Sequence, residues 1–488
     1  MIDFGKNDNR EFNDLAEKLI TKVLEDKFRV LSPDNPDHSL SLKNIAVSKP
    51  DDSPITYSSK KLTGGKLTMK VYGDIVELNK NGKEVKIREK KVLLGSVPYR
   101  TRMGTYLLGN DYNMTSQPRN IPSVYSTMSE TGKVQSAFQL DKGRAFKITV
   151  SDAGSLRIKT GDFTFHLFPL LLVMGMDEIE IEDIVGKKLF EKNRKFQWPA
   201  FYDAVNKAFF YEDEEFSKAS PSDKNAKIVD YMKNHTRMDG RTTETLTGIY
   251  SENVNKDLLA KVLEKTVKLY RREIPGDDRW DIRMSRIMTP SHIFADRLDK
   301  QLPKLLNKSM GKVRRGDIKG AFTNIITKSM EDSVLSSDLS RLDPQYNLIG
   351  TVLTGKVITP VGEGAIGDTG MVENRGREYH PTQTGIFDMT FIPQGMGVGL
   401  NLRAAPGLAV GDDGTPMVKL KNIKTGKVKP YPLTDAADLY IKFPGENDSG
   451  KIKAFHNYKE VEIPHSKATH VFAESVFADS MQLVPFPT

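Results

Sequence analysis

The stretch from Arg377 to Asn401, REYHPTQTGIFDMTFIPQGMGVGLN, holds the residues whose types and spacing most suggest chemistry. His380 is one of only eight histidines, and a histidine can hold or move a proton near neutral pH. Gly395, Gly397 and Gly399 alternate along the chain, which favours a bent backbone or the close approach of another chain. The pattern is typical of neither a helix nor a plain strand, so we expect a loop.

Several kinds of catalytic site are excluded by the composition. The chain has no cysteines, which rules out thiol nucleophiles, disulfides and zinc ribbons. No Walker-type loop, HExxH or GxSxG occurs,. His465 and His470 lie five residues apart without further ligands nearby, so two solvated histidines are expected rather than a metal site,. Residues 362–367 match GxGxxG, but Pro360 precedes them and no helical pattern follows, which argues against a dinucleotide site,.

Length and charge set broad limits. A chain of 488 residues is expected to form two to four domains,. The net charge of +8 suits a polyanionic partner such as nucleic acid, although a merely basic protein would share it,. The first ten residues contain no apolar segment typical of a signal peptide,. The most apolar run, Phe165 to Met176, contains a proline and is shorter than the ~20 residues of a membrane span,. A soluble, cytosolic-type protein is expected.

Hydrophobic periodicity predicts the elements that must position these residues. A period of 3.6 predicts four helices, and a period of two predicts strands. The helices are expected at residues 11–28, 255–273, 291–310 and 317–335, and hairpins at 66–94, turning at Asn81-Gly82, and at 417–431, turning at Thr425-Gly426 with one basic face. The third and fourth helices carry a basic run, which is either a solvated face or a contact for backbone phosphates. Its members are Lys300, Lys304, Lys308, Lys312, Arg314, Arg315 and Lys319.

The opening stretch resembles the β subunit of multi-subunit DNA-dependent RNA polymerases. His380-Pro-Thr, Gly385, Pro393-Gln394-Gly395 and Gly399-Leu400 fall at the spacing of that family. SSDLSRLDPQYNL, residues 336–348, resembles the rifampicin-pocket segment that precedes it. Four further blocks follow the family's order, at residues 92–125, 155–186, 277–294 and 471–488. The likeness covers roughly half of the chain, and little of it falls in residues 187–275 and 431–470.

The resemblance implies an α+β, multidomain fold. It implies a mixed, protrusion-like part (1–186), a helical, lobe-like insert (187–275) and a return to the protrusion (276–335). A loop- and strand-rich, fork-like region (336–410) would line the RNA–DNA hybrid, and a strand-rich region (411–488) would end at a split point. The chain would then be the N-terminal part of a split β subunit, of the divergent kind found in large-genome bacteriophages.

The resemblance also implies which residues face nucleic acid. These are Asp338, Arg341, Asp343, Asn347, Arg377, His380, Pro393, Gln394, Gly395 and Arg403. Arg377 would give cationic support, His380 a hydrogen bond or a packing contact, and the Pro-Gln-Gly a tight loop against the hybrid. The family usually has glutamate where Gln394 stands, and the expected histidine and arginines after Asp343 are replaced by GTVLTGKV. These departures predict resistance to rifampicin.

No catalytic residue and no cofactor are expected on this chain. By the resemblance, Mg2+ of the assembled enzyme would be held by aspartates of a β′-like partner. Expected partners are a C-terminal β fragment, β′-like subunits, the DNA template, the RNA–DNA hybrid and a phage promoter-specificity subunit, with no membrane. The expected location is the cytoplasm of an infected bacterial host or the virion. Two other hypotheses stay open: a basic structural or DNA-packaging phage protein, and a nucleotide-binding enzyme built on Gly362 to Gly367.

Overall fold

The computed structural model confirms the α+β class, with several sheets and many helices. It describes residues 1–4, 9–35, 37–129, 131–343, 347–362, 365–390, 395–446 and 449–478. The chain divides into two compact units. Unit one combines residues 1–119 with 287–488, and unit two is continuous from 120 to 286.

The first segment of unit one centres on the predicted hairpin of β4 and β5, which turns at Gly82 with φ +75°. These strands belong to a sheet of order β2-β3-β4-β5, and β15-β7-β6 form another. The predicted helix 11–28 is confirmed as α1. The elements are β1 (Ile2–Asp3), α1 (Arg10–Lys27), β2 (Arg29–Leu31), β3 (Ser39–Ser48), α2 (Pro54–Leu62), β4 (Thr68–Leu78), β5 (Glu84–Pro98), β6 (Tyr106–Leu108), β7 (Asp111–Thr115) and β8 (Gln117–Asn120).

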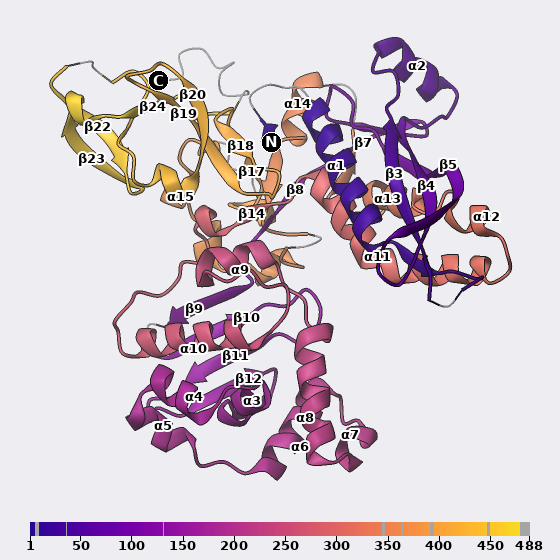
Figure 1. Cartoon of the computed structure of the whole chain (residues 1–488). Helices are drawn as coiled ribbons and strands as arrows, with labels where there is room; N and C mark the ends of the chain where they lie inside the picture. Colours follow the sequence, from indigo (N-terminus) through magenta and orange to yellow (C-terminus); the bar gives the residue numbers. More distant parts are fainter. Residues whose placement is uncertain are drawn as a thin grey trace. The chain divides into compact units, whose positions relative to one another are not determined.

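Three helices of the second segment complete the core of unit one. α11 (Pro290–Val313) packs along α1 (Figure 1) and confirms the helix predicted at 291–310. Leu24, Leu94, Leu298 and Phe322 are buried together in this core because the apolar sides of α1, β5 and α11 meet there,.

The prediction of one helix at 317–335 is wrong, because this segment forms two helices, α12 (Ile318–Phe322) and α13 (Thr327–Leu335). Between them Asn324 takes φ +54°, and its N–H donates to the Leu93 carbonyl. The Ile326 N–H donates to the Leu94 carbonyl in the same way. Hydrogen bonds to strand β5 therefore replace the bonds that a continuous helix would make.

The rest of unit one is rich in strands and loops. An eight-stranded sheet has the order β1-β18-β19-β24-β21-β22-β23, with β20 on β19, and a second sheet has the order β14-β8-β16-β17. The elements are β14 (Arg286–Ile287), β15 (Ser340–Leu342), α14 (Leu348–Thr354), β16 (Val357–Thr359), η3 (Thr369–Met371), η4 (Asn374–Arg377), η5 (Pro381–Gln383), η6 (Gly395–Gly397), β17 (Leu402–Arg403), β18 (Leu408–Val410), β19 (Pro416–Asn422), β20 (Val428–Pro432), α15 (Leu433–Ala436), β21 (Ile441–Lys442), β22 (Lys451–His456), β23 (Lys459–Pro464), η7 (His465–Lys467) and β24 (His470–Phe472).

The hairpin predicted at 417–431 is confirmed as β19 and β20, but its single basic face is wrong in part. Lys419 is 6% exposed, and its ammonium lies 2.9 Å from Asp3 and 3.5 Å from Glu474. A buried lysine needs such partners, since an unpaired buried charge is costly. Lys421 and Lys429 do lie on the surface.

Unit two is a five-stranded antiparallel sheet of order β13-β12-β11-β10-β9, with α10 packed against β9, β10 and β11 (Figure 1). The helix predicted at 255–273 is confirmed as α10. The elements are β9 (Val124–Met128), β10 (Val134–Phe138), β11 (Phe146–Val150), β12 (Leu156–Thr160), β13 (Phe163–His166), α3 (Phe168–Val173), α4 (Glu178–Val185), α5 (Lys187–Asn193), α6 (Trp198–Phe209), α7 (Glu214–Lys218), α8 (Pro221–Asp230), η1 (Tyr231–His235), α9 (Gly240–Thr247), α10 (Lys256–Tyr270) and η2 (Ile282–Met284).

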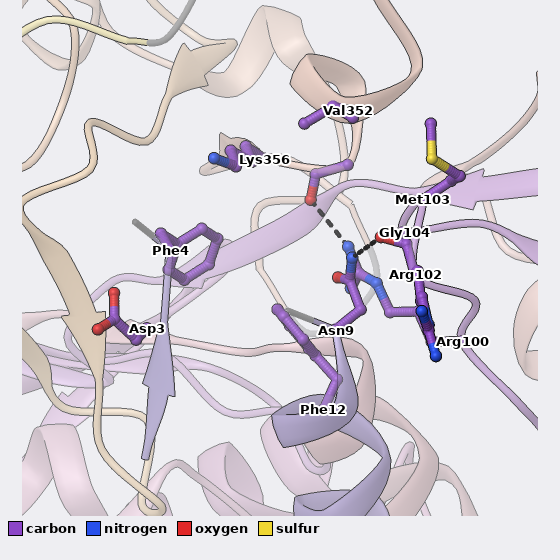
Figure 2. A pocket seen from close by; sticks show the side chains of 11 residues that line it. Asp3, Phe4, Asn9, Phe12, Arg100, Arg102, Met103, Gly104, Val352 and Lys356 are labelled. Atoms are coloured by element: carbon purple, nitrogen blue, oxygen red, sulfur yellow. Dashed lines mark hydrogen bonds between the residues drawn. The ribbon is translucent and has the colours of Figure 1, made fainter. Parts of the chain in front are cut away.

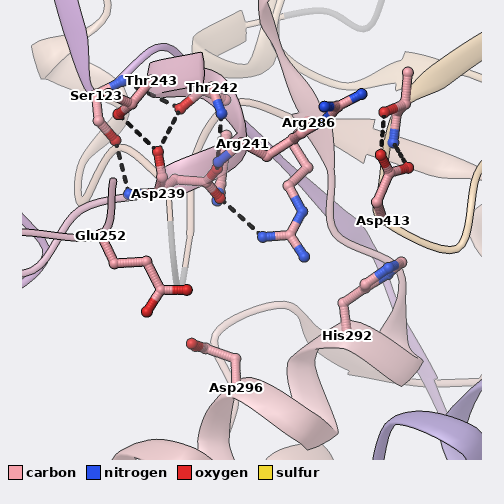
Figure 3. A network of polar contacts seen from close by, with 12 residues as sticks. Ser123, Asp239, Arg241, Thr242, Thr243, Glu252, Arg286, His292, Asp296 and Asp413 are labelled. Carbon is pink, nitrogen blue, oxygen red and sulfur yellow. Dashed lines mark hydrogen bonds and ion pairs between the residues drawn. The ribbon is translucent and has the colours of Figure 1, made fainter. Parts of the chain in front are cut away.

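Asp239 is the centre of a polar network inside unit two (Figure 3). One carboxylate oxygen accepts the backbone N–H groups of Arg241 and Thr242, both at 3.0 Å, and so caps α9. The other accepts from Arg286 at 2.9 Å and Asn120 at 3.2 Å. Burial alone would raise the pKa of this carboxyl, but the Arg286 charge and the hydrogen bonds hold the pKa below its usual value,. The network joins both ends of unit two's chain segment to α9.

Candidate nucleic-acid interface

The loop that contains the opening stretch is braced by Arg377. Its Nη1 donates to the Val398 carbonyl at 3.1 Å, and its Nη2 donates to the Thr369 carbonyl at 2.8 Å. Gly399 lies against the backbone of the same arginine: a Cβ there would come within 2.0 Å of the Arg377 carbonyl oxygen. Gly399 also has φ +69°, so only glycine fits,. Arg377 is half-buried and therefore fixes the loop while part of its surface faces solvent.

His380 holds the turn that follows. Its Nδ1 lies 2.6 Å from the Thr382 hydroxyl and accepts the Thr382 N–H at 3.3 Å, which caps the short helix η5. The hydroxyl and the N–H of Thr382 thus orient the half-buried imidazole. This geometry gives His380 a positioning part in the loop.

A second group of predicted residues lies on β15 and the start of α14. Arg341 is exposed on β15, which forms the edge of its sheet beside β7. Asp338 is exposed just before that strand. The Asp343 carboxylate accepts from the Thr351 hydroxyl at 2.9 Å, and the Asn347 side chain caps α14 by accepting the Gly350 N–H at 3.1 Å. Asp343 and Asn347 thus fix the local fold, whereas Arg341 presents its side chain to solvent.

Arg403 lies on β17, which directly follows in the sequence the loop that Arg377 braces. It pairs with Val357 of β16, and its carbonyl accepts the Asp388 N–H at 2.9 Å. Burial lowers the pKa of the Arg403 guanidinium, and the Asp388 charge opposes that shift. Asp388 is itself buried and accepts from Thr390 at 2.6 Å. Arg403 is therefore half-buried beside a fixed carboxylate rather than freely exposed.

Two predicted residues, Pro393 and Gln394, lie outside the described residues. Gly395 is described, exposed, and has φ +74° with open space where a Cβ would be. The eight predicted residues that the structure describes form two sets by location: one from Asp338 to Asn347 at β15 and the start of α14, and one from Arg377 to Arg403 on the glycine-rich loop and β17. No catalytic set of nucleophile and base emerges from their geometry.

The GxGxxG match does not open a helix in the part of it that the structure describes. Gly362 has φ +126°, and a Cβ there would lie 2.5 Å from the Leu339 side chain. Its N–H donates to the Ile366 carbonyl, which closes a small turn. The next helical residues, Thr369–Met371, form a single 3-10 turn. Gly362 therefore serves a close packing contact, whereas Gly367 has open space where a Cβ would be.

Sequence reasoning missed Arg100, which lines a cavity of about 40 Å³ within unit one (Figure 2). Arg100 is 3% exposed, its guanidinium carbon lies 4.0 Å above the Phe12 ring centre, and its Nη2 donates to the Gly355 carbonyl at 3.1 Å. Burial lowers its pKa. The only signal in the sequence was that Arg100 follows the apolar residues Val97 to Tyr99. The lining is Asp3, Phe4, Asn9, Phe12, Arg100, Arg102, Met103, Gly104, Val352, Gly355 and Lys356.

The described residues hold neither a cluster of metal ligands nor a membrane-spanning helix. No group of three or more histidine, aspartate or glutamate side chains is placed to hold a metal ion. The expectation of two solvated histidines is wrong for His470, which is buried, with its Nε2 3.2 Å from the Tyr431 hydroxyl and 3.3 Å from Asn422. None of the described helices is long and apolar enough to cross a membrane.

Comparison with known proteins gives a distant relative. No protein-family model matches the chain. A subunit of a nucleic-acid polymerase does match: the chain is 21% identical over 401 residues to the DNA-directed RNA polymerase subunit beta of Zygnema circumcarinatum. The match covers 75% of this chain but 35% of that protein, so the chain spans about a third of its relative's length. The chain is thus distantly similar to an RNA polymerase β subunit over most of its residues.

Proposed function

We propose that this chain is a β-like subunit of a multi-subunit DNA-dependent RNA polymerase. The observation that carries the proposal is the similarity to an RNA polymerase β subunit over 401 residues, three quarters of the chain. The activity would be nucleotidyl transfer and would belong to the complex. A polymerase subunit without its own metal centre is expected to contribute shape and charge around the template.

The glycine-rich loop would form part of a wall that lies against nucleic acid. Its support is the geometry of Arg377, which fixes the loop through two backbone carbonyls. Gly395 has open space where a Cβ would be, which lets another chain come close,. Arg341, exposed on a sheet edge, would add a positive charge for a phosphate,. Mg2+ would be held by a β′-like partner.

Finer parts of the hypothesis stay predictions. They are that the subunit is split and phage-derived, that a C-terminal β fragment and a promoter-specificity subunit complete it, and that it acts in an infected bacterial cell or is carried in the virion. Resistance of the assembled enzyme to rifampicin is part of the same prediction. Inhibition of RNA synthesis by low rifampicin would contradict it.

Reconstitution tests the proposed function directly. The full chain, tagged and expressed in the cells that naturally produce it, should be purified with its partners under mild salt. The complex is expected to incorporate ribonucleotides into RNA only when DNA template and Mg2+ are present. A matched complex with Arg377→Ala should assemble but elongate more slowly, because the loop loses both carbonyl bonds. A purified complex with no template-dependent synthesis would overturn the proposal.

A structural or DNA-packaging role is the second candidate, and the net charge of +8 favours it,. Such a protein would bind DNA and would purify without any partner that carries a catalytic magnesium site. The same purification therefore separates the two functions.

A further inference from the structure

One side of α11 and the turn that follows it carry a row of cations, here called the lysine face: Lys300, Lys304, Lys308, Arg314 and Arg315. The three lysines are four residues apart, which places them on one side of the helix at steps of about 6 Å. All five residues are exposed. No aspartate or glutamate occurs from Lys300 to Gly316, so the row is uninterrupted by negative charge.

The charges in the middle of this row are not compensated within the chain. In the part of the chain that the structure describes, Lys304 and Lys308 make no hydrogen bond and no ion pair. Lys300 pairs with Asp296 at 2.7 Å. The two acids that flank the row in the sequence are used elsewhere: Asp299 binds Lys27 at 2.8 Å, and Asp317 caps α12.

Stabilisation of the helix does not explain the row. Cations favour a helix C-terminus, but this effect falls off within the last turn. Arg314 and Arg315 follow the end of α11 and are accounted for in this way, and the Arg315 Nε donates to the Gly311 carbonyl at 3.0 Å. Lys304 and Lys308 lie well before that turn, where two uncompensated like charges one turn apart slightly destabilise a helix.

The excess positive charge of the whole chain belongs to the same unit. Unit two holds 27 lysines and arginines against 26 aspartates and glutamates, a net charge of +1. Of the chain's +8, unit one therefore carries +7. A row of exposed cations that includes the two uncompensated lysines Lys304 and Lys308, on the more positive unit, is the pattern expected of a surface for polyanions,.

We infer that the lysine face binds the phosphate backbone of duplex DNA. From Lys300 to its end at Val313, α11 rises about 20 Å, and duplex DNA offers about one charge per 1.7 Å of its axis over such a length,. Single-stranded nucleic acid is usually held by aromatic side chains that stack on bases. Residues 300–316 contain no Phe, Tyr or Trp, so the face suits backbone contacts without base reading. The inference goes beyond the proposed function, since it concerns α11 rather than the glycine-rich loop.

Fluorescence anisotropy of the full chain with a labelled 24-base-pair duplex tests this inference. The double variant Lys304→Gln/Lys308→Gln is compared with Lys261→Gln/Lys268→Gln, which removes the same charge from α10 of unit two. We expect at least about fivefold weaker binding for the first variant at 0.1 M salt. The slope of log affinity against log salt should fall in magnitude by about 1.8, or 0.9 for each lost phosphate contact. The control should change binding less than twofold.

Three outcomes would overturn the inference. Equal losses in both variants would show that net charge alone attracts DNA. An unchanged affinity of the α11 variant would show that the face is only solvated. Stronger competition by single-stranded RNA or polyglutamate than by unlabelled duplex would assign the face to another polyanion. Thermal unfolding of both variants checks that each is folded. Because no partner subunit is present, the result stands whether or not the chain proves to be a polymerase subunit.

Discussion

α10 in unit two and α11 in unit one are both lysine-rich helices, but they differ in whether their lysines are paired with acidic side chains. On α10, Glu264 accepts from Lys261 at 2.9 Å and from Lys268 at 2.7 Å. On α11, Lys304 and Lys308 have no such partner among the described residues. Paired surface charges add a few tenths of a kcal/mol to a helix, whereas unpaired ones leave a field for a ligand. The paired lysines of α10 thus stabilise their helix, whereas the unpaired lysines of α11 are available to bind a ligand.

The same contrast extends to the sites of the two units. In unit two, the central carboxylate of Asp239 is satisfied by a cap and by Arg286. In unit one, the glycine-rich loop is shaped by carbonyl contacts of Arg377 and by glycines with positive φ. We therefore expect unit two to be sensitive to loss of charge and the loop of unit one to be sensitive to added bulk.

The largest expected effect is that of Gly385→Ala. Gly385 has φ +80°, and a Cβ there would lie 2.3 Å from Cε1 of the Phe472 ring. Strain and overpacking together should lower the free energy of unfolding of unit one by about 3 kcal/mol. Gly395→Ala is the matched control, since Gly395 has φ +74° but open space around it, and should cost about 1 kcal/mol,. Denaturant titration measures the free energy of unfolding of both variants. Equal losses would contradict the prediction, because they would mean that the loop shifts to accommodate the added methyl group.

Asp239→Asn should lower the free energy of unfolding of unit two by about 2 kcal/mol, because the buried pair with Arg286 loses its negative member,. The lowered pKa of Asp239 makes its contribution full above the unfolded value near 4 and lost as the pH falls through the folded value,. Calorimetry at pH 7 and pH 3 should show a smaller pH dependence for the variant. Asp162→Asn, at an exposed turn, serves as the control and should be neutral.

Glu264→Gln is the smallest change and tests the comparison of the helices most directly. It unpairs Lys261 and Lys268 and should lower stability by about 0.5 kcal/mol,. Lys268 and Lys261 hold the pKa of Glu264 below its usual value, so its stabilising effect is present above pH 4.5 and fades as the pH falls. DNA affinity should rise less than twofold. If DNA affinity instead rises as much as it falls in the Lys304→Gln/Lys308→Gln variant, then DNA binding depends on whether a lysine is paired and not on where it lies.

Local patterns in the sequence predicted much of the fold. Periodicity identified α1, α10 and α11, and the Asn81-Gly82 and Thr425-Gly426 turns identified two hairpins. Contacts between distant residues were beyond such patterns. The break between α12 and α13 depends on carbonyls of Leu93 and Leu94, and the burial of Lys419 depends on Asp3.

The candidate site was predictable only as a list of residues. The likeness to β subunits named Arg377, His380 and Arg403, but not that Arg377 would brace its own loop through two carbonyls. Nor could spacing reveal Arg100, because its burial results from packing against Phe12 and Gly355. Which of the named residues contact RNA stays a prediction.

The bond between the Ser96 N–H and the Thr327 hydroxyl joins residues 231 positions apart in the chain. During synthesis the β2–β5 sheet therefore leaves the ribosome long before α13, which packs on its strand β5. At about 5–20 residues per second the delay is roughly ten to fifty seconds. Unit two, made in one piece, is complete within that interval. The side of the sheet that α13 covers therefore stays exposed for this time. A chaperone that binds the exposed side would have the same interval in which to act.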